Sequence, residues 1–150
     1  MLFEKYIKKQ FFEEIRNFTS FGDPLILLLI AAIVTGFSSN LLQIIAGLII
    51  IELICSIIKL IYYKDRPNKE GHSNFLEKID AGSFPSIHTA RSSFVFLVLF
   101  MLAVSYVKWI FIALLLIVGL TRILLNKHYY FDVIVGYIIG ILTFALWWGI

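Results

Sequence analysis

The sequence predicts an all-α integral membrane protein, in which five transmembrane helices and an N-terminal amphipathic helix form a six-helix bundle. Of the 150 residues, 60% are hydrophobic, and the mean hydropathy is +0.90, whereas soluble domains contain about 45–50% apolar residues. The apolar residues gather in five long runs. The alternating segments that a membrane β-barrel requires do not occur in the sequence. The length fits one membrane domain, 1–150.

Residues 1–20 are expected to form the amphipathic helix. Lysine and glutamate occupy one face of this helix, so the segment lacks the apolar centre of a cleaved signal peptide. We expect the helix to lie in the membrane interface; the alternative is that it packs on a neighbouring protein surface. The apolar residues that recur at helical spacing are Leu2, Phe3, Tyr6, Ile7, Phe11, Phe12, Ile15 and Phe18.

The five apolar runs are the predicted transmembrane helices. A helix rises about 1.5 Å per residue, so about 20 residues cross a hydrocarbon core of about 30 Å. Helices are expected because hydrocarbon offers no partner for unpaired backbone groups. The first run is the shortest of the five. The predicted spans are 24–39, 41–62, 86–107, 109–125 and 131–150.

The connections between the runs differ in length and polarity. Asn40 separates the first two runs, and Lys108 separates the third from the fourth, whereas the connection 63–85 is long and polar and 126–130 is short and charged. Two spans lie between these polar connections, so both emerge on the same side of the membrane. We therefore expect one face of the protein to carry chemistry or binding.

Three polar clusters fall on this face, at the ends of the apolar runs. In a helical segment, a carboxylate four residues after an imidazole shares its face. Such a carboxylate fixes the tautomer and leaves the second ring nitrogen free to attack or to accept a proton. The clusters are Lys59 with Arg66, then Ser86 with His88, and then Arg122 with His128 and Asp132.

Together these clusters form a cage for an oxyanion. Guanidinium groups bind phosphate oxygens in pairs, and helix N-termini attract anions. Such a cage can stabilise the equatorial oxygens of a phosphoryl-transfer transition state. The acidic residues lack the clustering of a magnesium site, so we expect neither a metal ion nor another cofactor. No nucleic-acid motif accompanies the net charge of +3, and no nucleic-acid partner is expected.

The order and spacing of these residues resemble the pattern of the type 2 phosphatidic acid phosphatase superfamily, which is K-x(6)-R-P, then P-S-G-H, then S-R-x(5)-H-x(3)-D. The sequence reads Lys59 and Arg66-Pro67, then Pro85-Ser86-Ile87-His88, then Thr121-Arg122, His128 and Asp132. Two positions depart from the pattern. Ile87 replaces glycine and adds bulk beside the phosphate site, and Thr121 replaces serine but keeps a hydroxyl.

The resemblance implies a role for each matching residue. His128 would be the nucleophile that forms a phosphohistidine, and Asp132 would orient and polarise it. His88 would protonate the leaving oxygen and later activate water. The phosphoryl oxygens would be held by Lys59, Arg66, Ser86, Arg122 and the backbone N–H of Ile87.

Two charged residues lie outside the pattern. Arg91 follows His88 by one helical turn and is a candidate for contact with a lipid head group. Glu52 falls in the middle of a predicted span, where a carboxylate is unusual. We expect it to be structural, either protonated or hydrogen-bonded to a Ser or Thr of another span.

The expected function is therefore that of a metal-independent lipid phosphatase of the cell membrane, with a lipid phosphate as substrate and the bilayer as its surroundings. Phosphatidic acid, phosphatidylglycerophosphate and polyprenyl pyrophosphates are the substrates that the resemblance implies. A transporter and a non-catalytic binder of phosphorylated lipid are the alternatives. The active face carries every Lys and Arg except Lys108. This favours the cytoplasmic side, whereas the resemblance to bacterial relatives favours the outer side, so both orientations stay open.

Overall fold

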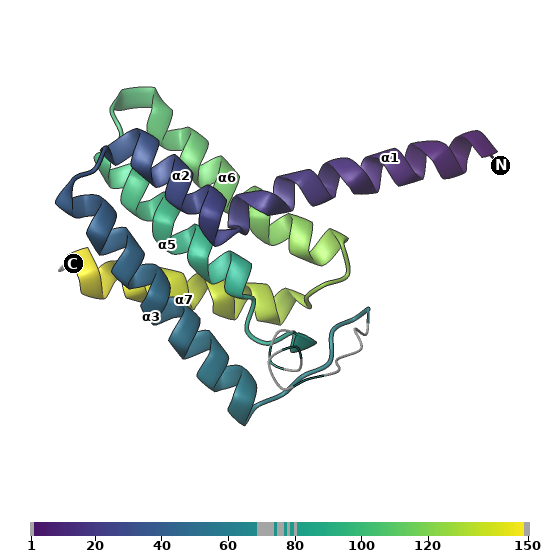
Figure 1. Cartoon of the computed structure of the whole chain (residues 1–150). Coiled ribbons are helices and arrows are strands. Elements are labelled where there is room, and N and C mark those ends of the chain that lie inside the picture. Colours follow the sequence, from purple (N-terminus) through teal and green to yellow (C-terminus); the bar gives the residue numbers. More distant parts are fainter. Residues whose placement is uncertain (1, 69–73, 75–76, 78, 80, 149–150) are drawn as a thin grey trace.

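The fold was analysed in a computed structural model that describes residues 2–68, 74, 77, 79 and 81–148 (Figure 1). Over these residues the secondary structure is helical and contains no strand, which confirms the predicted all-α class. Two short 3-10 helices, η1 (Ser20–Gly22) and η2 (Ser105–Val107), accompany the longer helices. The α-helices with twelve or more described residues are α1 (Leu2–Thr19), α2 (Pro24–Thr35), α3 (Ser39–Ile61), α5 (Ile87–Leu102), α6 (Lys108–Leu124) and α7 (Tyr130–Trp148).

Two of the described helices, α3 and α7, are by themselves long and apolar enough to cross a membrane. A third candidate is a broken span made of Gln10–Gly22 and Pro24–Thr35, which meet at an angle of 62°. Helix α5 is apolar but has only 16 residues. Length and composition thus indicate an integral membrane protein with two or three such spans, and the count of five stays a prediction.

Several helix ends differ from the predicted spans. Helix α2 ends at Thr35 instead of 39, because Gly36 adopts a φ of 63° that breaks the helix. Asn40 therefore lies inside α3 and is not a link. Helix α5 ends at Leu102 instead of 107, since Ala103 is extended. The last two residues of the predicted 131–150 span lie outside the described residues.

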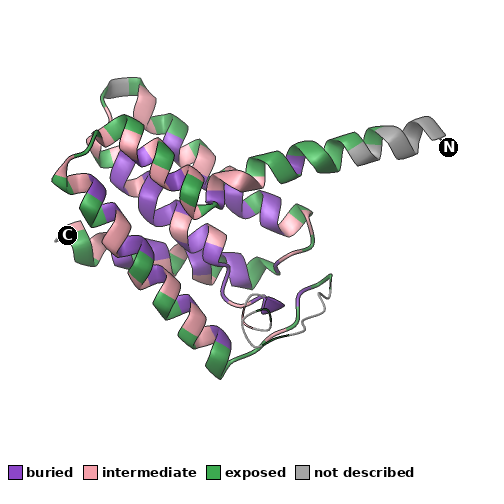
Figure 2. Ribbon diagram, in the orientation of Figure 1, coloured by how far each residue is buried: buried purple, intermediate pink, exposed green. Residues whose placement is uncertain are grey.

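Helix α5 forms the centre of the bundle and packs against α2, α3, α6 and α7. Most residues of α5 are buried, and they form a nearly continuous purple stretch in Figure 2. Glycines let two neighbours approach it closely. A Cβ at Gly47 of α3 would collide with the Phe94 ring, and one at Gly140 of α7 would collide with Ser93 and the backbone of Ala90. These glycines thus have the packing role that small residues serve between membrane helices.

The topology brings four helix ends together at one end of the bundle (Figure 1). These are the C-termini of α3 and α6 and the N-termini of α5 and α7. One backbone hydrogen bond joins the two polar connections there, and another joins the start of α5 to the first turn of α7. Asn68 N donates to Asn126 O over 3.1 Å, and Ser86 N donates to Asp132 O over 3.0 Å. The two polar connections therefore share one end of the bundle, as the sequence predicts.

Helix α1 projects from the bundle at this same end, and contacts α6 (Figure 1). Ile15 is its one buried side chain among those described, whereas Phe11 and Phe18 are exposed. This distribution is compatible with the predicted interfacial helix. At its C-terminus, Thr19 reaches Thr121 of α6, with 3.0 Å between the two hydroxyl oxygens.

Candidate active site

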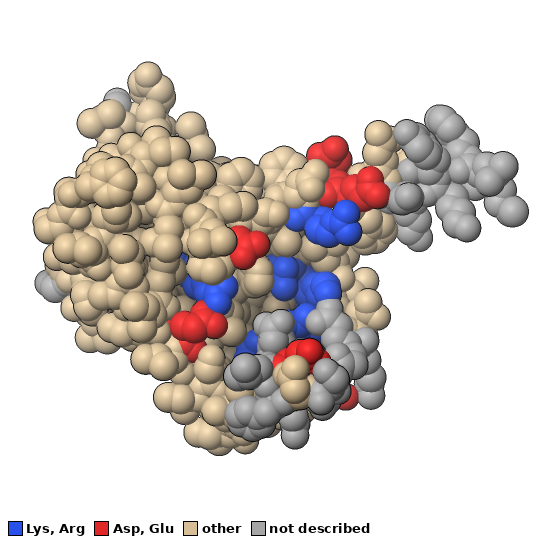
Figure 3. Space-filling model, in the orientation of Figure 1, with Lys and Arg blue, Asp and Glu red and all other residues tan. Residues whose placement is uncertain are grey.

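The polar end of the bundle contains an unusual number of buried charged side chains. Figure 3 shows Lys and Arg side chains gathered in a recess there, while most of the visible surface is uncharged. Buried cations need compensation from anions or water. The concentration of cations therefore indicates a site for an anion. The buried charged residues and histidines at this end are Lys59, Arg66, Arg122, His128 and Asp132.

Each cation is held by a different element. Lys59 lies in the last turn of α3 and is only 3% exposed, with Gly82 packed beside its aliphatic stem. Arg66 follows in the connection after α3. Arg122 lies in the last turn of α6, where its Nη1 donates to Thr19 Oγ1 over 3.3 Å. Helix α1 thereby contacts the predicted phosphate-binding set, which the sequence did not suggest.

The two predicted catalytic histidines lie within one electrostatic environment. Lys59, Arg66 and Arg122 are each close enough to act electrostatically on both His88 and His128. His88 is in the first turn of α5, and His128 is in the connection between α6 and α7. Two histidines that are far apart in the sequence thus lie near the same three cations.

His128 is held in one tautomer by the main chain. Its Nδ1 lies 2.6 Å from the carbonyl oxygen of Ser83. A carbonyl only accepts hydrogen bonds, so Nδ1 carries the proton and Nε2 keeps its lone pair. Burial, together with the positive charge of Arg122, lowers the pKa of His128 to about 2, although the Ser83 hydrogen bond opposes this shift. The imidazole is therefore neutral at ordinary pH, as a nucleophile must be.

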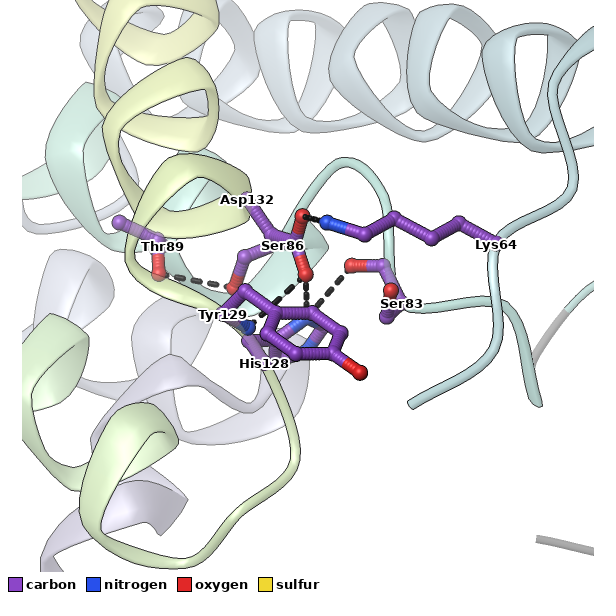
Figure 4. A network of polar contacts seen from close by, with 7 residues as sticks. All are labelled: Lys64, Ser83, Ser86, Thr89, His128, Tyr129 and Asp132. Atoms are coloured by element: carbon purple, nitrogen blue, oxygen red, sulfur yellow. Dashed lines mark hydrogen bonds and ion pairs between the residues drawn. The ribbon is translucent and has the colours of Figure 1, made fainter. Parts of the chain in front are cut away.

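Asp132 does not contact His128 in the way that the family resemblance implies. Its Oδ2 is 4.0 Å from Nδ1 of His128, which exceeds a hydrogen bond. Its carboxylate instead accepts hydrogen bonds from Lys64 Nζ at 2.6 Å and from the backbone N–H of Tyr129 at 2.9 Å (Figure 4). Tyr129 precedes the first residue of α7, so Asp132 caps this helix from its third position. The direct partner of the imidazole is the Ser83 carbonyl.

The N-terminus of α5 faces the same end. Ser86 is its N-cap, and the first intrahelical hydrogen bond runs from Ala90 N to Ser86 O. The N–H of Ile87 precedes that bond and belongs to the free N-terminal set of a helix. The Ile87 side chain is buried in the hydrophobic core, which accommodates the bulk that replaces the family glycine. The Ser86 hydroxyl lies 2.8 Å from that of Thr89.

Arg91 and Glu52 form a pair that the sequence analysis treated as two separate residues. Arg91 Nε donates to Glu52 Oε2 over 2.9 Å, and its Nη2 bonds the same oxygen. The partner of Glu52 is therefore an arginine of α5 and not a Ser or Thr. Among the described residues, no group of three or more His, Cys, Asp or Glu side chains is placed to hold a metal ion.

Sequence reasoning missed three residues that support the site. These residues are Lys64, Ser83 and Thr19, none of which belongs to the three motifs. Each acts through a partner that is distant in the sequence, so spacing gave no signal for it. The only available hint was the position of Ser83 and Lys64 next to the matching motifs.

Comparison with known proteins identifies the family and the fold. No curated protein sequence matches the chain. A crystal structure of a transmembrane PAP2-type phosphatidylglycerolphosphate phosphatase from Bacillus subtilis is similar in fold, with a TM-score of 0.77 and 22% sequence identity over 93% of this chain and 76% of that one. The family model of the PAP2 superfamily matches residues 40–150, which include the predicted site residues. The predicted family is thereby confirmed: this chain belongs to the PAP2 superfamily.

Proposed function

We propose that this chain is a membrane lipid phosphatase that hydrolyses a lipid phosphomonoester or pyrophosphate without a metal ion, through a phosphohistidine. One observation above all supports this function. A neutral imidazole, with Nδ1 committed to a carbonyl and Nε2 available, lies among three buried cations that also surround a second histidine. Nucleophilic attack on a phosphoryl group needs this combination of a lone pair and positive charge.

In the first step, Nε2 of His128 attacks the phosphorus atom. A bond forms between nitrogen and phosphorus, and the bond between phosphorus and the lipid oxygen breaks. His88, which takes up a proton when the anionic phosphoryl group binds beside it, gives that proton to the leaving oxygen, which departs as the lipid alcohol or, from a pyrophosphate, as the lipid monophosphate. The Ser83 carbonyl stabilises the positive charge that develops on the imidazole of His128.

In the second step, water hydrolyses the phosphohistidine. His88, now without its proton, accepts one from the water as the water oxygen attacks phosphorus. The bond between nitrogen and phosphorus breaks, inorganic phosphate leaves, and both histidines return to their starting states. Through both steps, the negative charge on the phosphoryl oxygens is stabilised by Lys59, Arg66, Arg122, the Ser86 hydroxyl and the N–H of Ile87.

Two cavities near the histidines are the candidates for the polar head and the apolar tail of the substrate. One, of about 400 Å³, opens beside His128 and is also lined by Tyr129 and Asn126. The other, of about 270 Å³, is lined by apolar side chains of α2 and α3 and by the pair of Glu52 and Arg91. It reaches Arg91, one helical turn after His88, so a head group at the histidines would leave its tail near this cavity.

The decisive experiment measures phosphate release from dioleoylphosphatidic acid in detergent micelles with excess chelator. We expect the wild-type chain to be active and His128→Ala to lose at least about 10³-fold in rate, because the nucleophile is gone. His72→Ala is the matched control, since His72 lies outside the three motifs and outside the described residues. Activity that is retained by His128→Ala, or abolished by the chelator, would refute the mechanism.

Intermediate trapping and substrate comparison refine the result. Rapid acid-free quenching with a radiolabelled lipid phosphate should label the wild-type protein but not His128→Ala, and the label should be lost in acid, as a phosphoramidate is. Parallel assays with phosphatidic acid, phosphatidylglycerophosphate and a polyprenyl pyrophosphate rank the head groups. Binding of all three lipids without turnover by the wild-type chain would favour the non-catalytic binder.

A further inference from the structure

Lys64 occupies an unexpected position between the two groups that face Nδ1 of His128. Its Nζ lies 2.6 Å from Asp132 Oδ1, and its backbone carbonyl accepts a hydrogen bond of 2.8 Å from the N–H of Ser83. The Ser83 carbonyl in turn accepts from His128. One residue thus fixes both the carbonyl that holds the imidazole and the carboxylate that lies 4.0 Å from it.

The contacts of Lys64 hold its side chain in place. Asp132 is fully buried, whereas the Lys64 side chain is 29% exposed. A buried carboxylate requires a cation or several donors, and Lys64 with the Tyr129 N–H supplies them. The Lys64 ammonium also lies 4.2 Å from the centre of the Tyr129 ring, over its face, which is a favourable cation–π distance.

We infer that Lys64 is a positioning residue, which neutralises Asp132 and so keeps His128 an uncharged nucleophile. The inference rests on the proposed function, because it assigns Lys64 to the same reaction. Its physical basis is electrostatic. A carboxylate 4.0 Å from an imidazole favours the imidazolium. The ammonium at 2.6 Å offsets this negative charge, and Asp132 is left to cap α7.

The other positive charges around His128 also disfavour protonation of its imidazole. Arg122 of α6, Lys59 of α3 and Arg66 of the connection oppose protonation of the imidazole. Asp132 of α7 favours protonation, because its Oδ2 lies 4.0 Å from Nδ1 of the ring. Neutralisation of Asp132 by Lys64 is thus one contribution, beside burial and these three cations, that keeps His128 uncharged.

The test compares Lys64→Met with Lys64→Arg, using dioleoylphosphatidic acid in detergent micelles from about pH 2 to pH 8, a range that includes the lowered pKa of His128. Without the ammonium, Asp132 should raise the pKa of His128, so protonation would remove the nucleophile at a higher pH. We expect the acidic limb of kcat/KM for Lys64→Met to move up by about one pH unit or more. Lys64→Arg keeps the charge and should retain the wild-type limb. Lys108→Met, at the opposite end of the bundle, is the control for loss of a lysine.

A double variant keeps the inference testable if Lys64→Met folds poorly, because Lys64→Met with Asp132→Asn leaves no unpaired buried charge. Its acidic limb should match that of Asp132→Asn alone. If the acidic limb of the kcat/KM profile does not move in Lys64→Met, Lys64 has only a structural role, even if the rate falls. That result would overturn the inference. A shift that persists in the Asp132→Asn background would also overturn it.

A readout without turnover separates this inference from the proposed function. In ¹⁵N-histidine-labelled protein, the His128 resonance is assigned by its loss in His128→Ala. Its titration should move to higher pH in Lys64→Met even if the chain does not hydrolyse the lipid. An inactive wild-type chain would refute the proposed function, whereas an unchanged titration would refute the role of Lys64.

Discussion

The chemistry of His128 depends on a main-chain group that no side-chain substitution removes. The Ser83 carbonyl fixes Nδ1 at 2.6 Å, whereas in a Ser-His-Asp triad the aspartate itself holds the imidazole. Asp132, at 4.0 Å, instead caps α7 and pairs with Lys64. The tautomer of His128 is therefore maintained independently of the carboxylate.

Asp132→Asn tests this division of roles. The amide oxygen can still cap Tyr129, and the Ser83 carbonyl still holds the imidazole, so we expect a loss in kcat of about 10- to 100-fold. The corresponding change in a triad, where the tautomer is lost, costs about 10⁴-fold. Steady-state assays of Asp132→Asn and His128→Ala side by side check the prediction. An equal loss in both variants would mean that Asp132 orients the imidazole directly.

Burial of a neutral His128 also links stability to pH. Its pKa is lowered to about 2 in the folded chain, while an unfolded histidine has a pKa of about 6.5. Between these values the unfolded state binds more protons, so stability is full above about pH 6.5 and falls as the pH decreases, by up to about 1.4 kcal/mol per pH unit. Thermal unfolding in detergent at about pH 8 and pH 5 should show a smaller decrease for His128→Gln than for the wild type. An equal decrease in both would contradict the assignment.

At the scale of elements, the bundle depends on close contact between α5 and α7. A Cβ at Gly136 would lie 2.6 Å from the backbone oxygen of Ser86. One at Gly140 would collide with the Ala90 carbonyl, and neither backbone group can rotate away. Since α5 carries His88 and α7 begins beside His128, this contact also sets the geometry of the site.

Gly140→Ala should therefore destabilise the protein. Overpacking of this kind costs about 1–3 kcal/mol, so the unfolding temperature in detergent should fall by several degrees. Ala113→Val, which adds methyl groups on an exposed position of α6, is the control and should leave the unfolding temperature nearly unchanged. An unaltered temperature for Gly140→Ala would show that the two helices can separate without cost.

The elements were predictable from the sequence where apolar runs were long, and their ends were predictable only where a local signal was clear. Pro24 opens α2 as expected. The run through Gly36 looked continuous because its composition hides the positive φ that ends the helix. The change of direction between α1 and α2 follows from the predicted interfacial helix and span, whereas its angle of 62° had no signal in the sequence.

At the scale of the whole molecule, motif spacing selected residues that the fold brings to the same end of the bundle. Spacing could not predict how these residues pair. The contacts of Asp132 with Lys64, of His128 with Ser83 and of Arg91 with Glu52 join separate elements. Such contacts depend on helix rotation and depth, which one sequence does not encode locally.

The number of membrane crossings depends on whether α5 and α6 are long enough to cross the bilayer. Helix α5 has 16 residues and α6 has 17, so each is about 25 Å long, slightly shorter than a hydrocarbon core of about 30 Å. Local thinning of the bilayer accommodates such a mismatch at modest cost. We therefore expect both helices to cross, which would place the connection after α3 and the one after α5 on opposite sides.

Single cysteines test this arrangement, because the native Cys55 is fully buried and can be replaced by serine. Asn68→Cys lies on the connection after α3, and Val104→Cys, at a position that is 77% exposed, lies beyond the end of α5. In sealed vesicles, a membrane-impermeant maleimide should label one of the two and reach the other only after detergent is added. Whichever site is labelled first also fixes the side of the catalytic face. Labelling of both in intact vesicles would mean that α5 enters and leaves the bilayer on the same side, and five crossings would be wrong.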